Sequence, residues 1–298
     1  QEMGLPKLQS KYDDERFFKE LSEFLKHAEY LSFYGGEPFL VKEHLRIFDM
    51  LIQMNIACRL FVNTNCCVLT EKTKTYIKKL NFFAIAVSRD SMIPQLHEKI
   101  RCGLHDDAYR KNLDWVIDYC KHNNVYLSIN TTEHRKNWFD IPQIFYWAEK
   151  INIPVHICHC IYPENVSLYT LPTNQLQYVT NYFVRWRERF CESFPKTNPL
   201  NRRSFDFLVN LCKKELSNRD ENWKYTVTAP NLINENKVDS SLGIPMIGYA
   251  PFNSEESILQ EIDYAVSLLG NDSMEMLTSF REESFSENVN NALDKKLN

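Results

Sequence analysis

The stretch that decides the fold runs from residue 30 to residue 38 and reads YLSFYGGEP. Its first five residues form an apolar, strand-like run, and a helical run near Leu40–Met54 follows it. The chain has only seven glycines, so the adjacent pair Gly35 and Gly36 needs a reason. Glycine permits backbone angles and close ligand approach that other residues forbid. At the end of a strand, bare backbone lies where parallel α/β sheets bind ligands. The alternative is a tight strand-to-helix turn with an acidic cap.

Strand-like and helical runs alternate along the first part of the chain. The strand-like runs are Glu29–Tyr34, Ala57–Asn65, Phe82–Ser88, Val125–Thr132 and Pro154–Ile161. The helical runs are Asp14–His27, Leu40–Met54, Glu71–Leu80, Asp107–His122 and Trp138–Lys150. This alternation indicates βαβ units, and no Asn-Gly or Asp-Gly hairpin signal interrupts it. We therefore predict an α/β fold, a partial open (β/α) barrel of parallel strands ordered as in the sequence.

After residue 162 the pattern changes to a loop, Pro163–Pro172, and then to helical runs. These runs are Thr173–Glu192, Ser204–Leu216, Glu255–Leu269 and Ser286–Lys296. Aromatic side chains in the first of them recur at the spacing of a helix core face. They are Tyr178, Tyr182, Phe183, Trp186 and Phe190. We predict two domains, a barrel over residues 1–165 and a helical C-terminal extension over residues 166–298.

Each strand-like run has one apolar face and one small or polar face, because residues two apart share a face. The polar faces include Ala84, Ala86 and Ser88 in the third run, and Ser128, Asn130 and Thr132 in the fourth. A plain closed barrel fills its interior with Val, Ile and Leu. The polar faces therefore favour a ligand cavity, unless they pair with one another.

Composition excludes several classes of protein. The 298 residues carry a net charge of −4 without a long basic stripe, so we expect no nucleic-acid partner. No apolar run approaches the ~18–20 residues that a membrane helix needs, so we expect no membrane partner. Nine cysteines, an odd number without regular spacing, suit a reducing compartment, and we expect a cytoplasmic protein.

Four motifs follow one another, each at the end of a predicted strand or just beyond it. They are Gly35-Gly36-Glu37-Pro38, Asn63-Thr64-Asn65, Val87-Ser88-Arg89-Asp90-Ser91 and Ile100-Arg101-Cys102-Gly103. In this order they resemble the core of the radical S-adenosylmethionine (SAM) enzymes, over roughly residues 10 to 162. The resemblance is strongest to members whose C-terminal extension is a SPASM or shortened twitch module. It implies a TIM-barrel-like enzyme that uses a [4Fe–4S] cluster and an external electron donor to cleave SAM reductively. Such an enzyme abstracts hydrogen from a small-molecule or peptide substrate.

The resemblance also implies which residues bind SAM. In the family, the backbone of the first motif receives the amino group of the methionine moiety; here it is formed by Gly35, Gly36 and Glu37, followed by Pro38. Strand-end carbonyl groups are suitable acceptors for an ammonium group. Asn65 matches the family's strand-end asparagine.

Three more residues match family positions near the ribose and the carboxylate of SAM. Ser88 and Asp90 match the serine and aspartate after the third strand, and Asp90 could accept both ribose hydroxyls. Arg101 matches the arginine that can pair with the cofactor carboxylate. Alternatively, Ser88 is a packing residue, Asp90 caps the following turn, and Arg101 forms a surface ion pair.

The largest departure from the family is the missing cluster motif. The family binds its cluster with Cys-x3-Cys-x2-Cys before the Gly-Gly-Glu-Pro strand, yet this spacing is absent and no cysteine precedes Cys58. Because a cluster needs its thiolates, we expect the ligands upstream of this chain and an inactive fragment. A start at Gln1 fits a chain that lacks the first barrel strand, which would leave Glu29–Tyr34 as an exposed sheet edge. The alternatives are a degenerate, non-catalytic relative that acts as a binding module, and an unrelated βα-barrel binding protein.

Two groups of cysteines stand apart from these motifs. Cys66-Cys67 follows a strand, but adjacent cysteines are poorly placed to bind one metal, so packing or solvent-exposed thiols are expected. Cys158 and Cys160 share a strand face with His156. They are read as core cysteines, with substrate-facing thiols or a metal site as alternatives. The sequence assigns no catalytic residue and no metal ligand within this chain.

Overall fold

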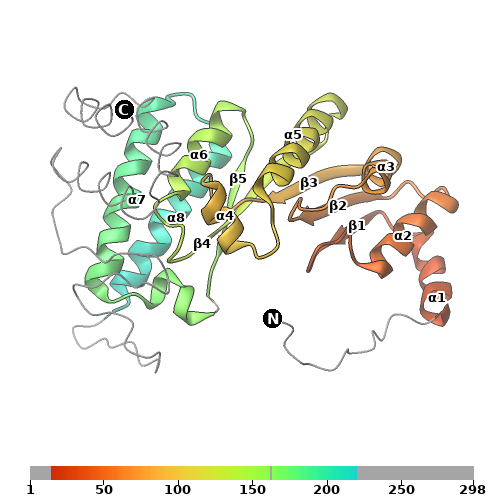
Figure 1. Ribbon diagram of the computed structural model, residues 1–298, viewed down its shortest axis with the longest axis horizontal. Coiled ribbons are helices and arrows are strands. Elements are labelled where there is room, and N and C mark those ends of the chain that lie inside the picture. Colours follow the sequence, from red (N-terminus) through yellow and green to blue (C-terminus); the bar gives the residue numbers. More distant parts are fainter. Residues whose placement is uncertain (1–14, 162, 220–298) are drawn as a thin grey trace. The chain divides into compact units, whose positions relative to one another are not determined.

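The computed structural model describes residues 15–161 and 163–219 (Figure 1). The sheet and the helices around it are α1 (Glu15–Leu25), β1 (Tyr30–Phe33), α2 (Lys42–Gln53), β2 (Arg59–Thr64), α3 (Glu71–Lys79), β3 (Phe82–Ser88), α4 (Pro94–Ile100), α5 (Asp106–Asn123), β4 (Tyr126–Glu133), α6 (Ile141–Lys150) and β5 (Val155–His159). Two 3-10 helices and two long helices follow: η1 (Glu164–Val166), η2 (Leu168–Thr170), α7 (Thr173–Ser193) and α8 (Pro199–Ser217).

The strands form one open sheet in the order β1-β2-β3-β4-β5. The predicted α/β class, the parallel strands and their sequential order are confirmed. β1 is an edge strand, as expected, and Tyr30 at its start is 50% exposed. The predicted runs between residues 14 and 217 all occur, with ends displaced by a few residues. The two predicted helices Glu255–Leu269 and Ser286–Lys296 lie outside the described residues.

One helix, α4, was not predicted from the sequence. It has only seven residues and begins with Pro94. Proline is favoured at the first position of a helix because it has no N–H to leave unpaired and its φ is already helical. So short a run shows little helical periodicity, which explains why the sequence pattern misses it.

The described chain packs as two compact units. Unit 1 comprises residues up to Ser88 together with 107–128, and so holds α1 to α3, β1 to β3, nearly all of α5 and the start of β4. Unit 2 comprises residues 89–106 and those from 129 onward, with α4, the rest of β4, β5 and α6 to α8. The predicted boundary near residue 165 stays a prediction, since most of the proposed extension lies outside the described residues.

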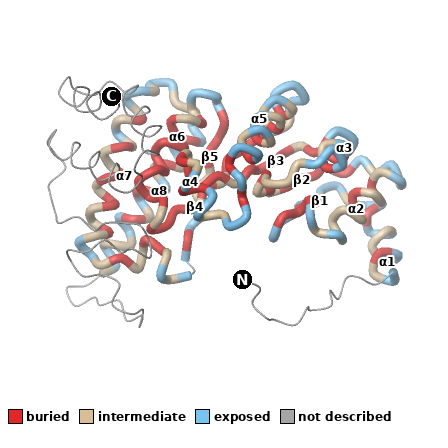
Figure 2. The backbone as a smooth tube through the Cα atoms, in the orientation of Figure 1, coloured by how far each residue is buried: buried red, intermediate tan, exposed pale blue. Residues whose placement is uncertain are grey.

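In unit 1 buried residues lie along β2 and β3 (Figure 2). Along β2 the buried side chains alternate with partly exposed ones, as a period of two requires. Phe48 of α2 is fully buried and contacts Phe33 of β1 and Phe82 of β3, with ring centroids 4.7 and 6.1 Å apart. The amphipathic helix α2 therefore covers the apolar face of the sheet in this unit.

Many residues of the helices in unit 2 are buried (Figure 2), and aromatic side chains form much of its core. Phe145 of α6 stacks on Phe205 of α8 with ring centroids 4.5 Å apart, and Trp186 of α7 is fully buried. The predicted core face of α7 is thus confirmed, although Tyr178 is only partly buried. Asn201 fixes α8 to β5, because its Oδ1 accepts from the Val155 N–H at 2.7 Å. None of the helices within residues 15–161 and 163–219 has the length and apolar character to cross a membrane.

Candidate functional site

The Gly35-Gly36 step follows β1 and adopts left-handed backbone angles. The φ values are +82° at Gly35 and +48° at Gly36, a region that favours glycine. A Cβ atom placed on either residue would meet no other atom within 4 Å. Glycine is therefore required here by backbone angle rather than by crowding, and the space beside this backbone is open to a small group.

Glu37 joins the loop after β1 to the end of β2. Its side chain is buried, with 6% of the residue exposed. Oε1 accepts from the Thr64 hydroxyl at 2.8 Å and from the Phe39 N–H at 3.3 Å, and Oε2 accepts from the Asn65 N–H at 2.7 Å. Hydrogen bonds to an ionised carboxylate are the stronger kind. The Glu37 side chain thus holds the loop after β1 to the end of β2, a role that the sequence did not predict. Pro38, also buried, follows it.

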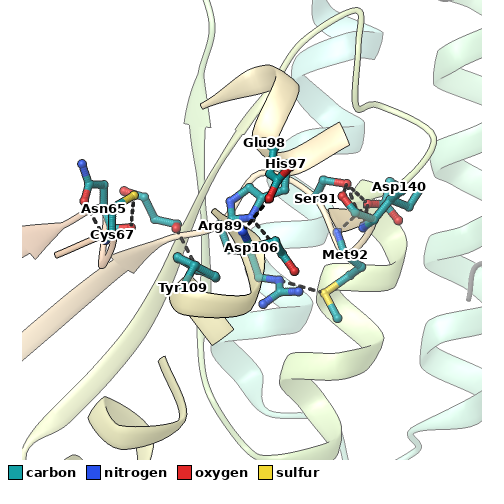
Figure 3. A network of polar contacts seen from close by, with 12 residues as sticks. Asn65, Cys67, Arg89, Ser91, Met92, His97, Glu98, Asp106, Tyr109 and Asp140 are labelled. Carbon is teal, nitrogen blue, oxygen red and sulfur yellow. Dashed lines mark hydrogen bonds and ion pairs between the residues drawn. The ribbon is translucent and has the colours of Figure 1, made fainter. Parts of the chain in front are cut away.

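Asn65 organises the turn after β2. Its Oδ1 accepts from the Cys67 N–H at 2.9 Å (Figure 3). Cys66, which stands where the family resemblance expects glycine, has φ +57°, and Asn112 donates to its carbonyl at 2.9 Å. The buried position of Cys66 raises the pKa of its thiol, as expected for a packing cysteine. Cys67 is partly exposed.

Ser88 is the last residue of β3 and is partly buried. Its carbonyl accepts from the Tyr109 hydroxyl at 3.0 Å (Figure 3). Because β1, β2 and β3 are neighbouring parallel strands, Gly36, Asn65 and Ser88 all lie at the carboxyl edge of unit 1. The structure therefore brings the three predicted motif segments of this unit, to which these residues belong, to one edge of the sheet.

Asp90 and Arg101 belong to unit 2 and are paired with each other. Asp90 is 4% exposed; its Oδ2 lies 2.8 Å from Arg101 Nη2, and its Oδ1 accepts from the Thr132 N–H at 2.8 Å. Asn137 donates to the carbonyls of both Asp90 and Thr132 at 2.8 Å. Arg101 Nε is buried without a hydrogen-bond partner among the described residues. The single cleft predicted for residues of both units stays a prediction.

A buried carboxylate on α6 anchors the loop after β3. Asp140 Oδ2 accepts from the Ser91 hydroxyl at 2.5 Å and from the Met92 N–H at 2.6 Å (Figure 3). Burial raises the pKa of Asp140. Arg89 is also buried, with its guanidinium carbon 5.1 Å from the centre of the Trp147 ring. Ser91 and Arg89 depart from the family pattern, and the structure gives each of them a specific contact.

A second buried pair connects α4 to α5. His97 Nδ1 lies 3.0 Å from Asp106 Oδ1, and Glu98 accepts from the Asp106 N–H at 2.8 Å (Figure 3). Burial lowers the pKa of His97, so the ring is neutral at neutral pH. This pair orders the segment that carries Arg101.

The ends of β4 and β5 carry a polar centre that the sequence did not predict. Glu133 and His159 are the last residues of these strands and are partners in register. Glu133 Oε1 lies 2.9 Å from His159 Nδ1, and it accepts from the Tyr169 hydroxyl at 3.0 Å and the Cys160 N–H at 3.2 Å. Burial raises the pKa of Glu133. The sequence analysis selected Cys158 and Cys160, which flank His159, but not His159 itself. The signal that could have identified this centre is Glu133, an acidic residue at the end of a strand with a polar face.

The cysteines form neither disulfides nor a metal site in the described structure. All nine are free thiols. Among residues 15–161 and 163–219, no group of three histidine, cysteine or acidic side chains is placed to bind a metal ion. The alternative of a metal at His156, Cys158 and Cys160 is therefore not supported. Nor do these residues fit a [4Fe–4S] cluster, which needs a set of convergent thiolates.

Comparisons with known proteins find matches among solved structures only. No family model and no curated protein matches the sequence. SuiB from Streptococcus suis, bound to S-adenosylmethionine, matches with 15% identity and a TM-score of 0.41, over 60% of this chain and 40% of SuiB. AnSMEcpe, with bound AdoMet and a peptide, matches with 17% identity and a TM-score of 0.42, over 59% of this chain and 53% of that one.

A third solved structure is a domain of pyruvate-formate lyase-activating enzyme from Bacteroides vulgatus. It matches with 16% identity and a TM-score of 0.37, over 52% of this chain and 93% of that domain. The chain thus spans about 40% of the length of SuiB and nearly all of this domain.

Proposed function

We propose that this chain is the SAM-binding part of a radical SAM enzyme of the twitch or SPASM-like kind. The parent enzyme would cleave SAM reductively and abstract hydrogen from a small-molecule or peptide substrate, with an external electron donor, in the cytoplasm. One observation supports this most. Three residues selected by motif, Gly36, Asn65 and Ser88, lie at the carboxyl ends of three neighbouring parallel strands. Parallel α/β sheets bind their ligands at this edge.

The residues in unit 1 fit the methionine end of SAM. The turn at Gly35 and Gly36 offers backbone acceptors beside open space, which suits an ammonium group. In unit 2, Arg101 Nε has no partner among the described residues and could donate to a carboxylate. Asp90 would accept the ribose hydroxyls in addition to its bonds to Thr132 and Arg101. SAM and the cluster, when bound, supply the radical chemistry, and this chain's residues bind and orient SAM.

We propose that the cluster is bound by residues from outside this chain. The sequence has no Cys-x3-Cys-x2-Cys, and its described thiols do not converge. We propose that the ligands lie in the natural sequence upstream of residue 1.

A second function, that of a non-catalytic binding module, is supported by two observations. The cluster spacing is absent from the sequence, and Asp90 and Arg101, two of the predicted SAM contacts, already neutralise each other. Such a module would keep the strand-end edge for a partner or peptide without radical chemistry.

Anaerobic reconstitution with iron and sulfide separates the two functions. We expect no stoichiometric cluster in this chain, and about four irons with SAM cleavage to 5′-deoxyadenosine after extension through the natural upstream sequence. No cluster in the extended chain would favour the binding module. A cluster in the unextended chain would contradict the proposal that its ligands lie upstream.

A pair of glycine substitutions tests the predicted SAM contact. Gly36 and Gly103 both have positive φ, and a Cβ on either would meet open space. Gly36→Ala should weaken SAM binding by the extended protein about tenfold, since its methyl group would occupy the ligand's space, whereas Gly103→Ala should not. Equilibrium dialysis with labelled SAM measures both. Equal affinities in the two variants would exclude the Gly35-Gly36 turn as the SAM contact.

A further inference from the structure

The carboxyl ends of β4 and β5 carry a buried acid next to an exposed histidine. The Glu133 side chain is 0% exposed, whereas the His159 side chain is 31% exposed. They are in register at the ends of neighbouring strands. None of the proposed SAM contacts uses either side chain, so this centre is available for a separate role.

The Glu133 carboxylate is held in place through one of its oxygens. Oε1 accepts from the Tyr169 hydroxyl and the Cys160 N–H and contacts His159 Nδ1. Oε2 is buried and has no hydrogen-bond partner among the described residues. With its position fixed by Tyr169 and the backbone, the carboxylate can accept from only one kind of ring, an imidazole with its proton on Nδ1.

The orientation of the His159 ring follows from the same contacts. Its centroid is 4.3 Å from that of Tyr169, at an interplanar angle of 73°. No described residue forms a hydrogen bond with Nε2. If Nδ1 carries the proton, Nε2 presents a lone pair on the side of the ring away from the carboxylate. The same use of a buried carboxylate to fix a histidine tautomer produces general bases in enzymes.

The thiols and the hydroxyl group next to Glu133 are protonated at neutral pH. Burial raises the pKa of Tyr169, of Cys160 and of Cys212, which faces Tyr169 from α8. The Tyr169 hydroxyl and these two thiols are thus not available as bases.

We infer that Glu133 and His159 form a proton-accepting site for a substrate that carries an O–H or N–H group. The Nε2 lone pair forms the new N–H bond, the substrate O–H or N–H bond breaks, and its electron pair stays on the oxygen or nitrogen. Glu133 stabilises the imidazolium through Nδ1–H, and the proton later leaves to water from the exposed ring. No oxidant or reductant is needed. The inference goes beyond the proposed function and stands without any iron–sulfur chemistry.

The first test measures the tautomer of His159 in the full chain. Histidine labelled with ¹⁵N gives separate shifts for protonated and unprotonated ring nitrogens. At pH 8 we expect the proton of His159 on Nδ1. The exposed His27, to whose ring no described residue hydrogen-bonds, should carry it mainly on Nε2. Glu133→Leu, which removes the acceptor, should convert His159 to the pattern of His27. A proton on Nε2 of His159 in the unaltered protein would overturn the inference, and this measurement requires no variant.

The second test measures the reactivity of Nε2. Diethyl pyrocarbonate acylates unprotonated imidazole, and mass spectrometry gives the rate at each histidine. Glu133→Gln keeps a carbonyl oxygen for Nδ1–H but removes the charge, so the rate at His159 should fall about tenfold while the rate at His27 is unchanged. His122 is the matched control in the native protein, because its carboxylate partner, Asp118, is exposed rather than buried. Equal rates at His159 before and after Glu133→Gln, or a slower rate at His159 than at His122, would overturn the inference.

Discussion

Two buried glutamates, Glu37 in unit 1 and Glu133 in unit 2, use their oxygens in opposite ways. Both oxygens of Glu37 accept hydrogen bonds, from the backbone and from Thr64. Glu133 collects its three contacts on Oε1, and Oε2 has no partner among the described residues. A carboxylate whose two oxygens both accept hydrogen bonds stabilises the fold. A carboxylate with one unpartnered oxygen next to an exposed histidine can also take part in proton transfer.

The largest difference in the free energy of unfolding is expected between the two glutamate-to-glutamine variants. In Glu37→Gln an amide NH2 must face either the Asn65 N–H or the donors on the other oxygen, so we expect a loss of about 3 kcal/mol in the free energy of unfolding. In Glu133→Gln the NH2 takes the place of the unpartnered oxygen, and the loss should stay below about 1 kcal/mol. Urea unfolding measures both values. Equal losses would remove the distinction between the two carboxylates.

The next largest effect is expected when the free energy of unfolding is measured as a function of pH, because of a buried histidine in unit 2. His134 follows Glu133, and burial lowers its pKa from 6.5 to about 4. The unfolded chain therefore binds this proton near pH 6.5 and the folded chain only near pH 4, so stability is lost as pH falls through this window. Between pH 7.5 and pH 5 the loss should be about 2 kcal/mol.

The control for this titration is a pair of asparagine substitutions. His134→Asn retains an acceptor for the Lys136 N–H, which bonds to Nδ1 at 3.1 Å, and should reduce the acid-induced loss. His122→Asn, at an exposed ring, should leave it unchanged. If both variants keep the full acid dependence, His134 is not its origin.

Removing one hydroxyl donor from each glutamate tests the same contrast on a smaller scale. Thr64→Val removes a donor to Glu37 and also the acceptor of the Cys66 N–H at 3.0 Å, so we expect a loss of about 1.5 kcal/mol. Tyr169→Phe leaves Glu133 Oε1 with its two other contacts and should cost about 1 kcal/mol or less. The comparison would be weakened if Tyr169→Phe proved the more damaging change in urea.

The smallest change in the free energy of unfolding is expected from a glycine substitution in the loop after β1, which Glu37 holds to β2. Gly35→Ala introduces a methyl group at φ +82° without a clash, so strain alone should cost about 1 kcal/mol. Gly103→Ala, at φ +87° in unit 2, should cost the same. A much larger loss at Gly35, measured by urea unfolding, would show that the loop needs glycine for more than its backbone angle.

Local patterns in the sequence predicted most of the fold. The strand Phe82–Ser88 was predicted to the residue, because an apolar run is bounded by polar residues on both sides. The start of α3 was also predicted, and Thr70 caps it by accepting from the Thr73 N–H at 3.1 Å. Periodicity and capping are encoded in adjacent residues, so one sequence suffices to find them.

The contacts that organise the candidate site could not be predicted in this way. Ser91 donates to Asp140, which lies 49 residues later in the chain, and Glu133 accepts from Tyr169, which lies 36 residues later. Such pairings depend on how elements pack, which periodicity does not encode. Asp90 lies just beyond the end of β3, whereas Arg101 follows α4, and their pairing with each other is a tertiary feature. Their roles toward SAM, like those of Gly36, Asn65 and Ser88, remain predictions.

The hydrogen bond from the Asn65 N–H to Glu37 has a consequence for solvent exchange. This amide lies beyond the end of β2, where loop amides ordinarily exchange with deuterium within seconds to minutes, yet its acceptor is a buried carboxylate 2.7 Å away. Exchange at position 65 requires the loop after β1 to separate from β2. The Cys67 N–H, held only by the side chain of Asn65 at 2.9 Å, can open alone. Two amides two residues apart would therefore report different motions, one of a whole sheet edge and one of a single turn.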